Sequence, residues 1–534
     1  MSNPNPKSDL VIDRQDFDPK NYWYIHGKYY NLTNYMEKHP GGKFILEKTK
    51  GQGDLSALYE SYHAFSNIDN IDKYLKTFEV KFRAPETTLQ SQQHQYKTDN
   101  YNIIYVPQNN IYDAYMNIAN SFESQQDEQE HEIEETETQD QEIQEHEYKQ
   151  PSTIENQPQN ETQFDFTNYR ILTQQAKRIF PTRESIKANH EWYALVIAAF
   201  FTFFYSFYHG LFSSPQSLLQ KFAFLLPFLS TPLKVALLRT FFITLASASW
   251  LGLGFNVMHD GSHYAIITDP TINRYATKTY SALNGWNALI WFYHHVQNHH
   301  TYTGIDNKDP DLYMYHPLQI TAYENTHWVN TSLKKMHPYL FPFYFIFIPG
   351  QNIGQGFLYL IASFQRKISY TQLPDDLQIP NFYDTYDISF FFLSILAYEN
   401  ILLLGNGNWL LLYFFQTNFF YMFNIIFDHD LFETNVQNKY HGKDWAMQQI
   451  CHSGNFCNGN RFWTKWFGAI NHQIEHHLFP NMSNTHYPTI APLVKKYCKT
   501  NNIPYVHQPT FKEAIQSFVK TLYWHSIPQE QKRE

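Results

Sequence analysis

Histidines gather in three short clusters in the later part of the chain, at 259–263 (HDGSH), 294–300 (HHVQNHH) and 473–477 (QIEHH). Residues four apart share one face of a helix, so His259 with His263, and His295 with His299, can each present two imidazoles to one ion. Imidazole is a common neutral ligand of iron and zinc in proteins. The clusters predict a site for two metal ions, with seven ligands: His259, His263, His295, His299, His300, His476 and His477.

The second cluster contains two adjacent histidines that need different roles. Neighbouring residues on a helix point about 100° apart, so His294 and His295 cannot both face one ion. His295 lies four residues before His299 and shares its face, whereas His294 shares a face with Asn298. We therefore expect His295 to be the ligand and His294 to lie outside the ligand set.

Another pair of histidines lies near the N-terminus. His39 begins the sequence His39-Pro40-Gly41-Gly42, a rigid turn whose glycines let a flat ligand approach the backbone, and His63 follows 24 residues later. Two imidazoles on opposite sides of a haem iron leave no position open for oxygen, which suits electron transfer. The pair predicts a haem-binding electron carrier.

The residues around this pair resemble the cytochrome b5 fold across 9–84, namely Trp23, Tyr30, Leu32, Asp54, Leu58, Tyr59 and Tyr62. One mild departure is 54–56, which reads DLS where that family has Asp-Ala-Thr. The resemblance implies an α+β domain that binds haem b through His39 and His63.

The stretch 85–163 differs in composition from the rest of the chain. It is rich in Gln, Asn, Glu and Thr, and 123–147 alone carries 12 acidic residues without lysine or arginine. Such a stretch buries too little apolar surface to fold, so we expect a disordered linker. The net charge of −10 is thus local, and the remaining charge of about +2 does not indicate a nucleic-acid partner.

The part that follows predicts a membrane domain. Apolar runs at 191–212, 233–257, 388–404 and 409–427 are long enough for about four transmembrane helices. The basic segment 166–190 is expected at an anionic membrane surface. Pro349-Gly350 interrupts 338–362, which favours an interfacial segment, and all three histidine clusters then share one side of the membrane. The alternative is a large soluble helical core.

At this point the chain resembles a front-end (Δ5/Δ6-type) fatty acyl desaturase with a fused cytochrome b5 domain, over 9–84 and 164–525. Residues 473–480 read QIEHHLFP, with Gln473 where other membrane desaturases place histidine. The spacing His295-x-x-x-His299-His300, followed by TYTG and Asp309-Pro310-Asp311, resembles a longer variant found in a Δ5-like branch.

The resemblance implies an all-α polytopic domain with two iron ions, O2 as co-substrate and a membrane lipid acyl chain as substrate. It adds Gln473 to the catalytic residues and His429, in the sequence FNIIFDHD, to the metal ligands. Electrons would reach the haem domain from an NADH-cytochrome b5 reductase, since the chain has no Gly-rich dinucleotide fingerprint. The implied location is the endoplasmic reticulum membrane, with the N-terminus and the active site cytosolic.

Some questions stay open. The family usually has Val-Glu-Thr-Ser before an asparagine, whereas residues 449–455 read QICHSGN, with His452 at the threonine position. Because of this departure, the position of the new double bond (Δ5, Δ6, Δ8 or Δ4) is open. The acyl carrier, a coenzyme A, phospholipid or sphingoid base, is open as well. Aromatic residues after the first cluster either line an acyl channel or pack at the membrane interface: Trp286, Trp291, Phe292 and Tyr293.

Three other functions compete with this interpretation. A sphingolipid desaturase or a lipid hydroxylase with a fused haem domain would share the metal chemistry, and a membrane-anchored electron carrier would lack it. The spacing of Cys451 and Cys457 does not suit a zinc finger. Three cysteines in all exclude a disulfide scaffold and suit a reducing compartment.

Overall fold

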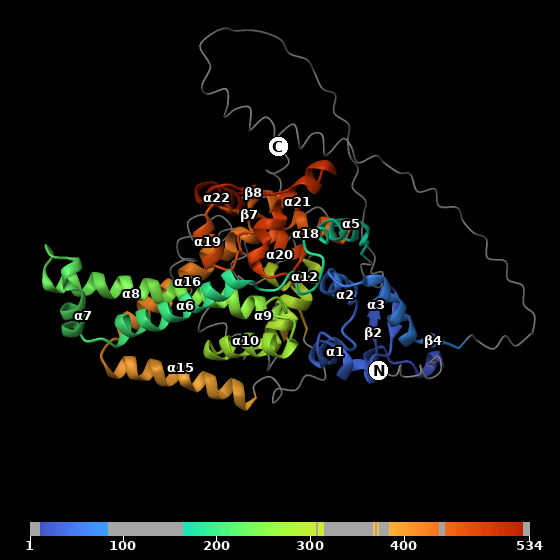
Figure 1. Ribbon diagram of the computed structural model, residues 1–534, viewed down its shortest axis with the longest axis horizontal. Coiled ribbons are helices and arrows are strands. Elements are labelled where there is room, and N and C mark those ends of the chain that lie inside the picture. Colours follow the sequence, from blue (N-terminus) through green and yellow to red (C-terminus); the bar gives the residue numbers. More distant parts are fainter. Residues whose placement is uncertain are drawn as a thin grey trace, which may run out of the picture. The chain divides into compact units, whose positions relative to one another are not determined.

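The computed structural model describes residues 11–83, 164–305, 308–313, 367–368, 371–372, 384–436 and 444–526 (Figure 1). The expected linker at 85–163 and the expected interfacial segment at 338–362 lie outside these residues.

Residues 11–83 form a small α+β domain, as the sequence predicts. Its strands are β1 (Val11–Ile12), β2 (Trp23–Ile25), β3 (Lys28–Tyr30) and β4 (Lys81–Phe82), and its α-helices are α1 (Lys43–Thr49), α2 (Ser56–His63) and α3 (Ile68–Leu75). β1 pairs with β4 in parallel, which ties the two ends of the domain together, while β2 and β3 form a hairpin. The buried Trp23 indole donates to the Leu46 carbonyl at 2.9 Å, so the hairpin and α1 share one core.

Four helices among the described residues are long and apolar enough to cross a bilayer: His190–Phe212, Thr231–Ser262, Thr385–Leu403 and Gly407–His429. They confirm the predicted runs. The first consists of α6 (His190–Phe207) and a π-helical turn to Phe212; the second consists of α8 (Thr231–Leu253), a π-helical segment (Gly254–His259) and α9 (Asp260–Ser262). The other two are single helices, α15 (Thr385–Leu403) and α16 (Gly407–His429).

These helices form one bundle. α8 packs against both α6 and α16, and α15 packs against α16 and against α10 (Pro270–Leu283) (Figure 1). Large apolar side chains stand on the outer faces, where Phe201, Phe241 and Phe392 are 67%, 54% and 57% exposed. Exposed apolar surface of this extent is unfavourable in water and is satisfied by lipid. The bundle therefore has the surface of a membrane domain.

Shorter elements complete the helical domain. They are α5 (Thr167–Ala176), α7 (Pro215–Phe222), α11 (Ala288–Trp291), α12 (His300–Tyr302), α17 (Phe432–Val436), α18 (Trp445–Cys451), α19 (Arg461–Trp466), α20 (Gln473–Leu478), α21 (Tyr487–Thr500), α22 (Phe511–Ser526), β5 (Lys367–Ile368), β6 (Thr371–Gln372), β7 (Asn455–Phe456) and β8 (His507–Gln508). α5, α18, α20 and α21 pack together around Trp445 and Ile474, which are fully buried. They give α20, which carries the third histidine cluster, a rigid support.

The helical domain contacts the α+β domain through α2. Glu60 of α2 forms an ion pair with Arg170 of α5 and lies 2.9 Å from the His26 ring nitrogen Nε2. Burial alone would raise the pKa of Glu60, but hydrogen bonds from His26 and Arg170 lower it overall. Glu60 is therefore an ionised carboxylate that is satisfied from both domains.

The basic segment 166–190 differs from its prediction. Besides Arg170, Lys177 donates to the Ser66 carbonyl of the α+β domain at 2.7 Å. Lys187 is 8% exposed and donates to the carbonyls of Tyr264 and Asn481, and burial lowers its pKa to about 7. The structure thus gives three cations of this segment protein partners, which the prediction of an anionic membrane surface did not include. Positive charge in a sequence does not by itself identify the partner.

Candidate metal centre

Two π-helical segments position the first two histidine clusters. One is Gly254–His259 at the end of α8, and the other is Phe292–His299, which runs into α12. A π-helix bonds each N–H to the carbonyl five residues back, so its turn is wider than that of an α-helix. The wider turn brings His300 beside His295, with their Nε2 atoms 3.2 Å apart. The α-helical spacing of four expected from the sequence thus applies to only part of this cluster.

One group of histidines draws on all three clusters. Ligand nitrogens of four residues lie within 4.8 Å of one another, namely His259, His263, His295 and His476. The Nε2 atoms of His259 and His295 are 3.1 Å apart, and the ring of His476 lies near that of His259 with their centroids 4.5 Å apart. Residues more than 200 positions apart in the chain therefore meet at one point.

A second group lies beside the first and contains His299, His429 and His477, whose ligand nitrogens are also within 4.8 Å of one another. His429 is the last residue of α16, and its Nε2 lies 3.1 Å from that of His477. The Gln473 amide nitrogen lies 3.0 Å from His429 Nε2 and 3.2 Å from His477 Nε2. Gln473 is thus beside the second group, at the position where the resemblance places a family-specific residue.

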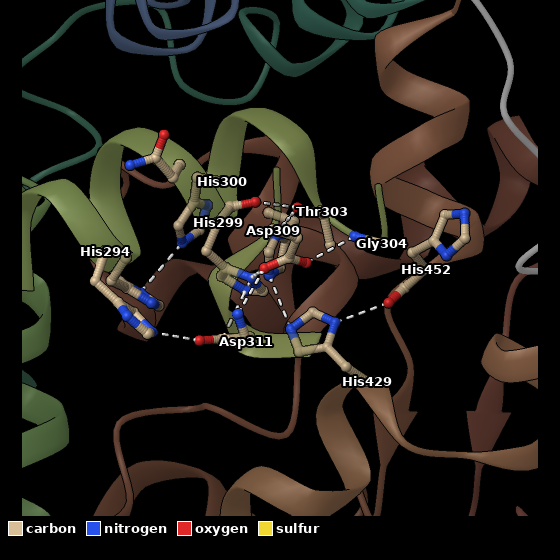
Figure 2. A network of polar contacts seen from close by, with 12 residues as sticks. His294, His299, His300, Thr303, Gly304, Asp309, Asp311, His429 and His452 are labelled. Carbon is tan, nitrogen blue, oxygen red and sulfur yellow. Dashed lines mark hydrogen bonds and ion pairs between the residues drawn. The ribbon is translucent and has the colours of Figure 1, made fainter. Parts of the chain in front are cut away.

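His300 lies between the two groups. Its ring centroid is 4.5 Å from that of His263 and 4.3 Å from that of His477. The structure thus brings together all eight histidines that the sequence analysis expects as ligands. His294 lies outside both groups, where its Nε2 atom contacts an Asp311 carboxylate oxygen at 2.6 Å (Figure 2).

Polar groups hold five of these imidazoles from outside through the Nδ1 atom. The five pairs are His263 with the Tyr62 hydroxyl at 2.9 Å, His299 with Asp309 at 2.9 Å, His429 with the His452 carbonyl at 2.7 Å, His476 with the Tyr487 hydroxyl at 3.1 Å, and His477 with the Gln449 amide oxygen at 2.8 Å. A proton on Nδ1 leaves the Nε2 lone pair for a metal ion. Ligating histidines in proteins are oriented in this way.

The polar groups that contact the histidines from outside, called the outer ring below, include two aspartates that the sequence analysis did not assign to the site. Asp309 accepts from His299 Nδ1 and from the Gly304 N–H, and Asp311 contacts both His294 and His299 (Figure 2). Burial alone would lower the pKa of His299, but Asp311 and Asp309 together raise it to about 9. The signal that could have found these residues was the Asp309-Pro310-Asp311 sequence directly after the second cluster.

The residues present fit two metal ions. Burial lowers the pKa of His295, His300, His476 and His477 far below its usual range, and neighbouring imidazoles lower it further, so these rings are neutral. The buried Nε2 atoms of His263 and His476 have no hydrogen-bond partner among the described residues. Converging lone pairs of neutral imidazoles are satisfied by cations, and imidazole with nearby carboxylate suits iron.

The unusual segment 449–455 contacts the second group. The side chain of Gln449 contacts His477 and the backbone carbonyl of His452 accepts from His429, so both flank metal-site histidines. Gly304 has φ +73, and a Cβ there would lie 2.3 Å from His452 Nδ1, so the His452 ring packs directly on this glycine. The departure from the family pattern thus lies at the metal site.

An apolar cavity opens beside the histidine groups. It is lined by His259, His295, His299 and His429 and, among its apolar residues, by Leu251, Phe255, Met258, Tyr421 and Ile425 of α8, its extension and α16. Trp286 and Trp291 also line it, as the acyl-channel interpretation expects. Phe292 and Tyr293 do not, because Phe292 packs on Phe44 and Tyr293 donates to the Lys48 carbonyl. The channel alternative thus fits the two tryptophans, whereas Phe292 and Tyr293 pack on the α+β domain.

The α+β domain has a separate crevice between His39 and His63. Their Nδ1 atoms contact the carbonyls of Gly42 and Tyr59 at 3.4 and 2.7 Å, which leaves the Nε2 atoms for a ligand. The ring centroids are 6.2 Å apart, close to the roughly 6 Å that a metal–nitrogen distance of about 2 Å on each side requires. A Cβ on Gly41 would lie 2.7 Å from the His39 ring, so this position requires glycine.

The crevice is lined by both domains. Apolar residues such as Leu32, Leu58 and Phe78 form its walls, while the helical domain contributes Arg183, Lys187, Tyr264 and Asn481. Burial, with the neighbouring His63 and Arg183, lowers the pKa of His39 to about 4, so its imidazole is neutral, as a haem ligand must be. These residues fit a haem with two axial histidines.

Comparisons with known proteins match both parts of the chain. Residues 12–81 match the family model described as cytochrome b5-like haem/steroid binding domain, and residues 234–509 match that of fatty acid desaturase. The chain is 24% identical to Delta(5) fatty acid desaturase A of Dictyostelium discoideum over 93% of this chain and 89% of that protein.

Two further relatives match about half of the chain. An acyl-lipid (8-3)-desaturase of Mortierella alpina is 26% identical, over 51% of this chain and 61% of that protein. An sn-1 linoleoyl-lipid 6-desaturase of Synechocystis sp. is 27% identical, over 53% of this chain and 78% of that protein. The chain therefore belongs to the fatty acid desaturase family and carries a cytochrome b5-like domain on the N-terminal side of its membrane domain.

Proposed function

We propose that this protein is a front-end fatty acyl desaturase, which introduces a double bond between an existing one and the carboxyl end of a lipid acyl chain. The observation that carries the proposal is the apolar cavity between membrane helices that ends at two groups of buried histidines. An acyl chain fits such a cavity, because its methylenes are satisfied by apolar walls while the histidines face one point along it.

Each set of residues has a role in this proposal. We assign the metal ligands to His259, His263, His295, His299, His300, His429, His476 and His477, with Gln473 beside the second group. Two iron ions bound there would supply the oxidising power that removes two vicinal hydrogens, with O2 and two electrons and two protons consumed and water released. Asp309, Asp311 and Gln449 orient the ligands, and Leu251, Phe255 and Trp286 exclude water from the acyl chain.

The electrons enter through the cytochrome b5-like domain. His39 and His63 are proposed to hold haem b, which would then carry electrons rather than bind O2. An NADH-cytochrome b5 reductase is the proposed source of the electrons. The proposed location is the endoplasmic reticulum membrane with the N-terminus and histidine groups cytosolic, supported by two pairs of membrane helices that each return the chain to one side.

Expression in a yeast that lacks polyunsaturated fatty acids tests the proposal. Candidate acids with a double bond near the methyl end are fed, and mass spectrometry locates any new double bond, with His263→Ala as the inactive control. A new double bond on the carboxyl side of the existing one, absent in the control, supports the proposal. A hydroxylated product, a desaturated sphingoid base or no product from the wild-type chain would contradict it.

A further inference from the structure

A tyrosine of the cytochrome b5-like domain contacts a histidine of the metal centre. Tyr62 is the penultimate residue of α2 and immediately precedes the haem-crevice histidine His63. Its hydroxyl lies 2.9 Å from Nδ1 of His263, 201 residues further along the chain. With the Nε2 lone pair of His263 directed to the metal centre, Nδ1 carries the proton and donates to the phenol oxygen.

Several polar contacts hold this part of α2 in place. The Asn481 side chain donates to the Tyr62 carbonyl at 2.9 Å, and the Tyr62 ring packs against Tyr264 with centroids 6.3 Å apart. Two residues earlier, Glu60 pairs with Arg170. The contact between Tyr62 and His263 is therefore part of a fixed interface that includes backbone, side-chain and charged interactions.

Tyr62 also lines the haem crevice, together with His39 and His63. One tyrosine thus faces the proposed haem site and touches a proposed metal ligand. Between the His63 ring and the His263 ring lie only one peptide unit, the Tyr62 side chain and one hydrogen bond. Two other aromatic pairs at this interface, Phe44 with Phe292 and Phe65 with Phe479, pack ring on ring and contact no histidine of either site in the described contacts.

We propose that Tyr62 conducts electrons from the haem site to the metal centre, along His63, Tyr62 and His263; this rests on the proposed desaturase function. In each transfer one electron leaves a ferrous haem, which becomes ferric, and the metal centre is reduced by one electron. No atom changes partner, because the hydrogen bond between Tyr62 and His263 persists. Two such transfers provide the two electrons that each desaturation with O2 consumes.

The full-length chain with Tyr62→Phe tests this role, because phenylalanine keeps the ring and removes only the hydroxyl. Tyr22→Phe is the matched control, since Tyr22 belongs to the same domain, is half-buried and packs on Phe17 outside the crevice. Purified proteins are compared for haem absorbance, iron per chain, and the rate at which the chemically reduced haem is reoxidised after mixing with O2 and acyl substrate.

We expect Tyr62→Phe to keep its haem and its iron, because His263 loses only a neutral hydroxyl and remains one of four clustered histidines. The variant should reoxidise its haem about 10–100-fold more slowly, the loss of activity typical when a partner of a metal-bound histidine is removed. The control should behave as the wild type. A second measurement reduces the metal centre directly with dithionite and a mediator dye, then adds O2 and substrate for a single turnover. Tyr62→Phe should then form the wild-type amount of product, because this route does not use the haem.

Other results would overturn the proposal. Wild-type haem reoxidation in Tyr62→Phe would mean that electrons take another path. Loss of iron, or failure of the dithionite-driven turnover, would mean that Tyr62 positions His263 rather than conducting electrons. A wild-type protein that reoxidises its haem quickly in a Tyr62-dependent manner without forming desaturated product would instead contradict the proposed function and leave the electron path in place.

Discussion

Asp309 offers a sharp test of the metal centre, because among the described histidines it is hydrogen-bonded to His299 alone. Its carboxylate is 2% exposed; one oxygen accepts from His299 Nδ1 at 2.9 Å and from the Asp311 N–H at 3.0 Å, and the other accepts from the Gly304 N–H at 2.7 Å. Asp309→Asn keeps the shape but replaces one oxygen with an NH2 group, which cannot accept. In either orientation of the amide, at least one buried N–H loses its acceptor.

The hydrogen bonds of Asp309 determine how strongly Asp309→Asn should affect stability and metal binding. A buried donor left without an acceptor costs about 1–3 kcal/mol, so the variant should fold but melt earlier. The effect on the metal is larger, because the amide either cannot accept from His299 or accepts without a negative charge. Removing such a partner of a ligating histidine typically weakens metal affinity or activity about 10–100-fold.

The assay measures iron per chain after dialysis against increasing concentrations of a chelator, in detergent-purified protein. Asp269→Asn is the control, since Asp269 caps α10 by accepting from the N–H groups of Thr271 and Ile272 and contacts no histidine in the described structure. Asp309→Asn should lose iron at about 10–100-fold lower chelator concentration than the wild type, whereas the control should retain it. Equal retention in Asp309→Asn would refute the assignment of His299 as a ligand oriented by this carboxylate.

Three further changes have distinct expected outcomes. His295→Ala should lose most of the iron and His294→Ala should retain most of it, measured as iron per chain, because only His295 is in a histidine group. Arg170→Gln should lower the melting temperature at neutral pH, because it removes a partner of Glu60. Since the pKa of Glu60 is lowered in the folded protein, the ion pair stabilises the fold above the usual carboxyl pKa of about 4.3. The difference in melting temperature between variant and wild type should shrink below that pH and vanish as the pH falls through the lowered Glu60 pKa. Leu251→Trp should fill part of the apolar cavity and shift the product profile, measured by gas chromatography, toward shorter acyl chains.

The features that the sequence predicts well are local ones. The four membrane helices follow from the length and composition of single segments, and the α+β domain follows from residues within 9–84. The placement of the first histidine cluster is also predictable, because it directly follows the apolar run that forms α8. His429 belongs to none of the three clusters and was expected only from the family resemblance; it is the last residue of α16.

The features that the sequence does not reveal depend on packing between distant segments. Tyr62 touches His263 and Gln449 touches His477 only because α2, α18 and α20 meet around the site. The π-helical turn that brings His300 beside His295 is likewise invisible to a helical pattern with a period of 3.6. The same reason explains why the sequence does not reveal the pairing of Arg170 with Glu60, which is 110 residues away in the chain.

One contact in the outer ring of the metal centre connects the two domains. Four of the five groups that hold the Nδ1 atoms come from the membrane domain, and the fifth, the Tyr62 hydroxyl, comes from the cytochrome b5-like domain. The set of Nδ1 partners is therefore complete only while the two domains are in contact. The partner of His263 sets its tautomer, while the position of the ring is also fixed by its neighbours His295, His300 and His476. The contact that completes this set thus also links the histidine groups to the domain that we propose as the electron donor.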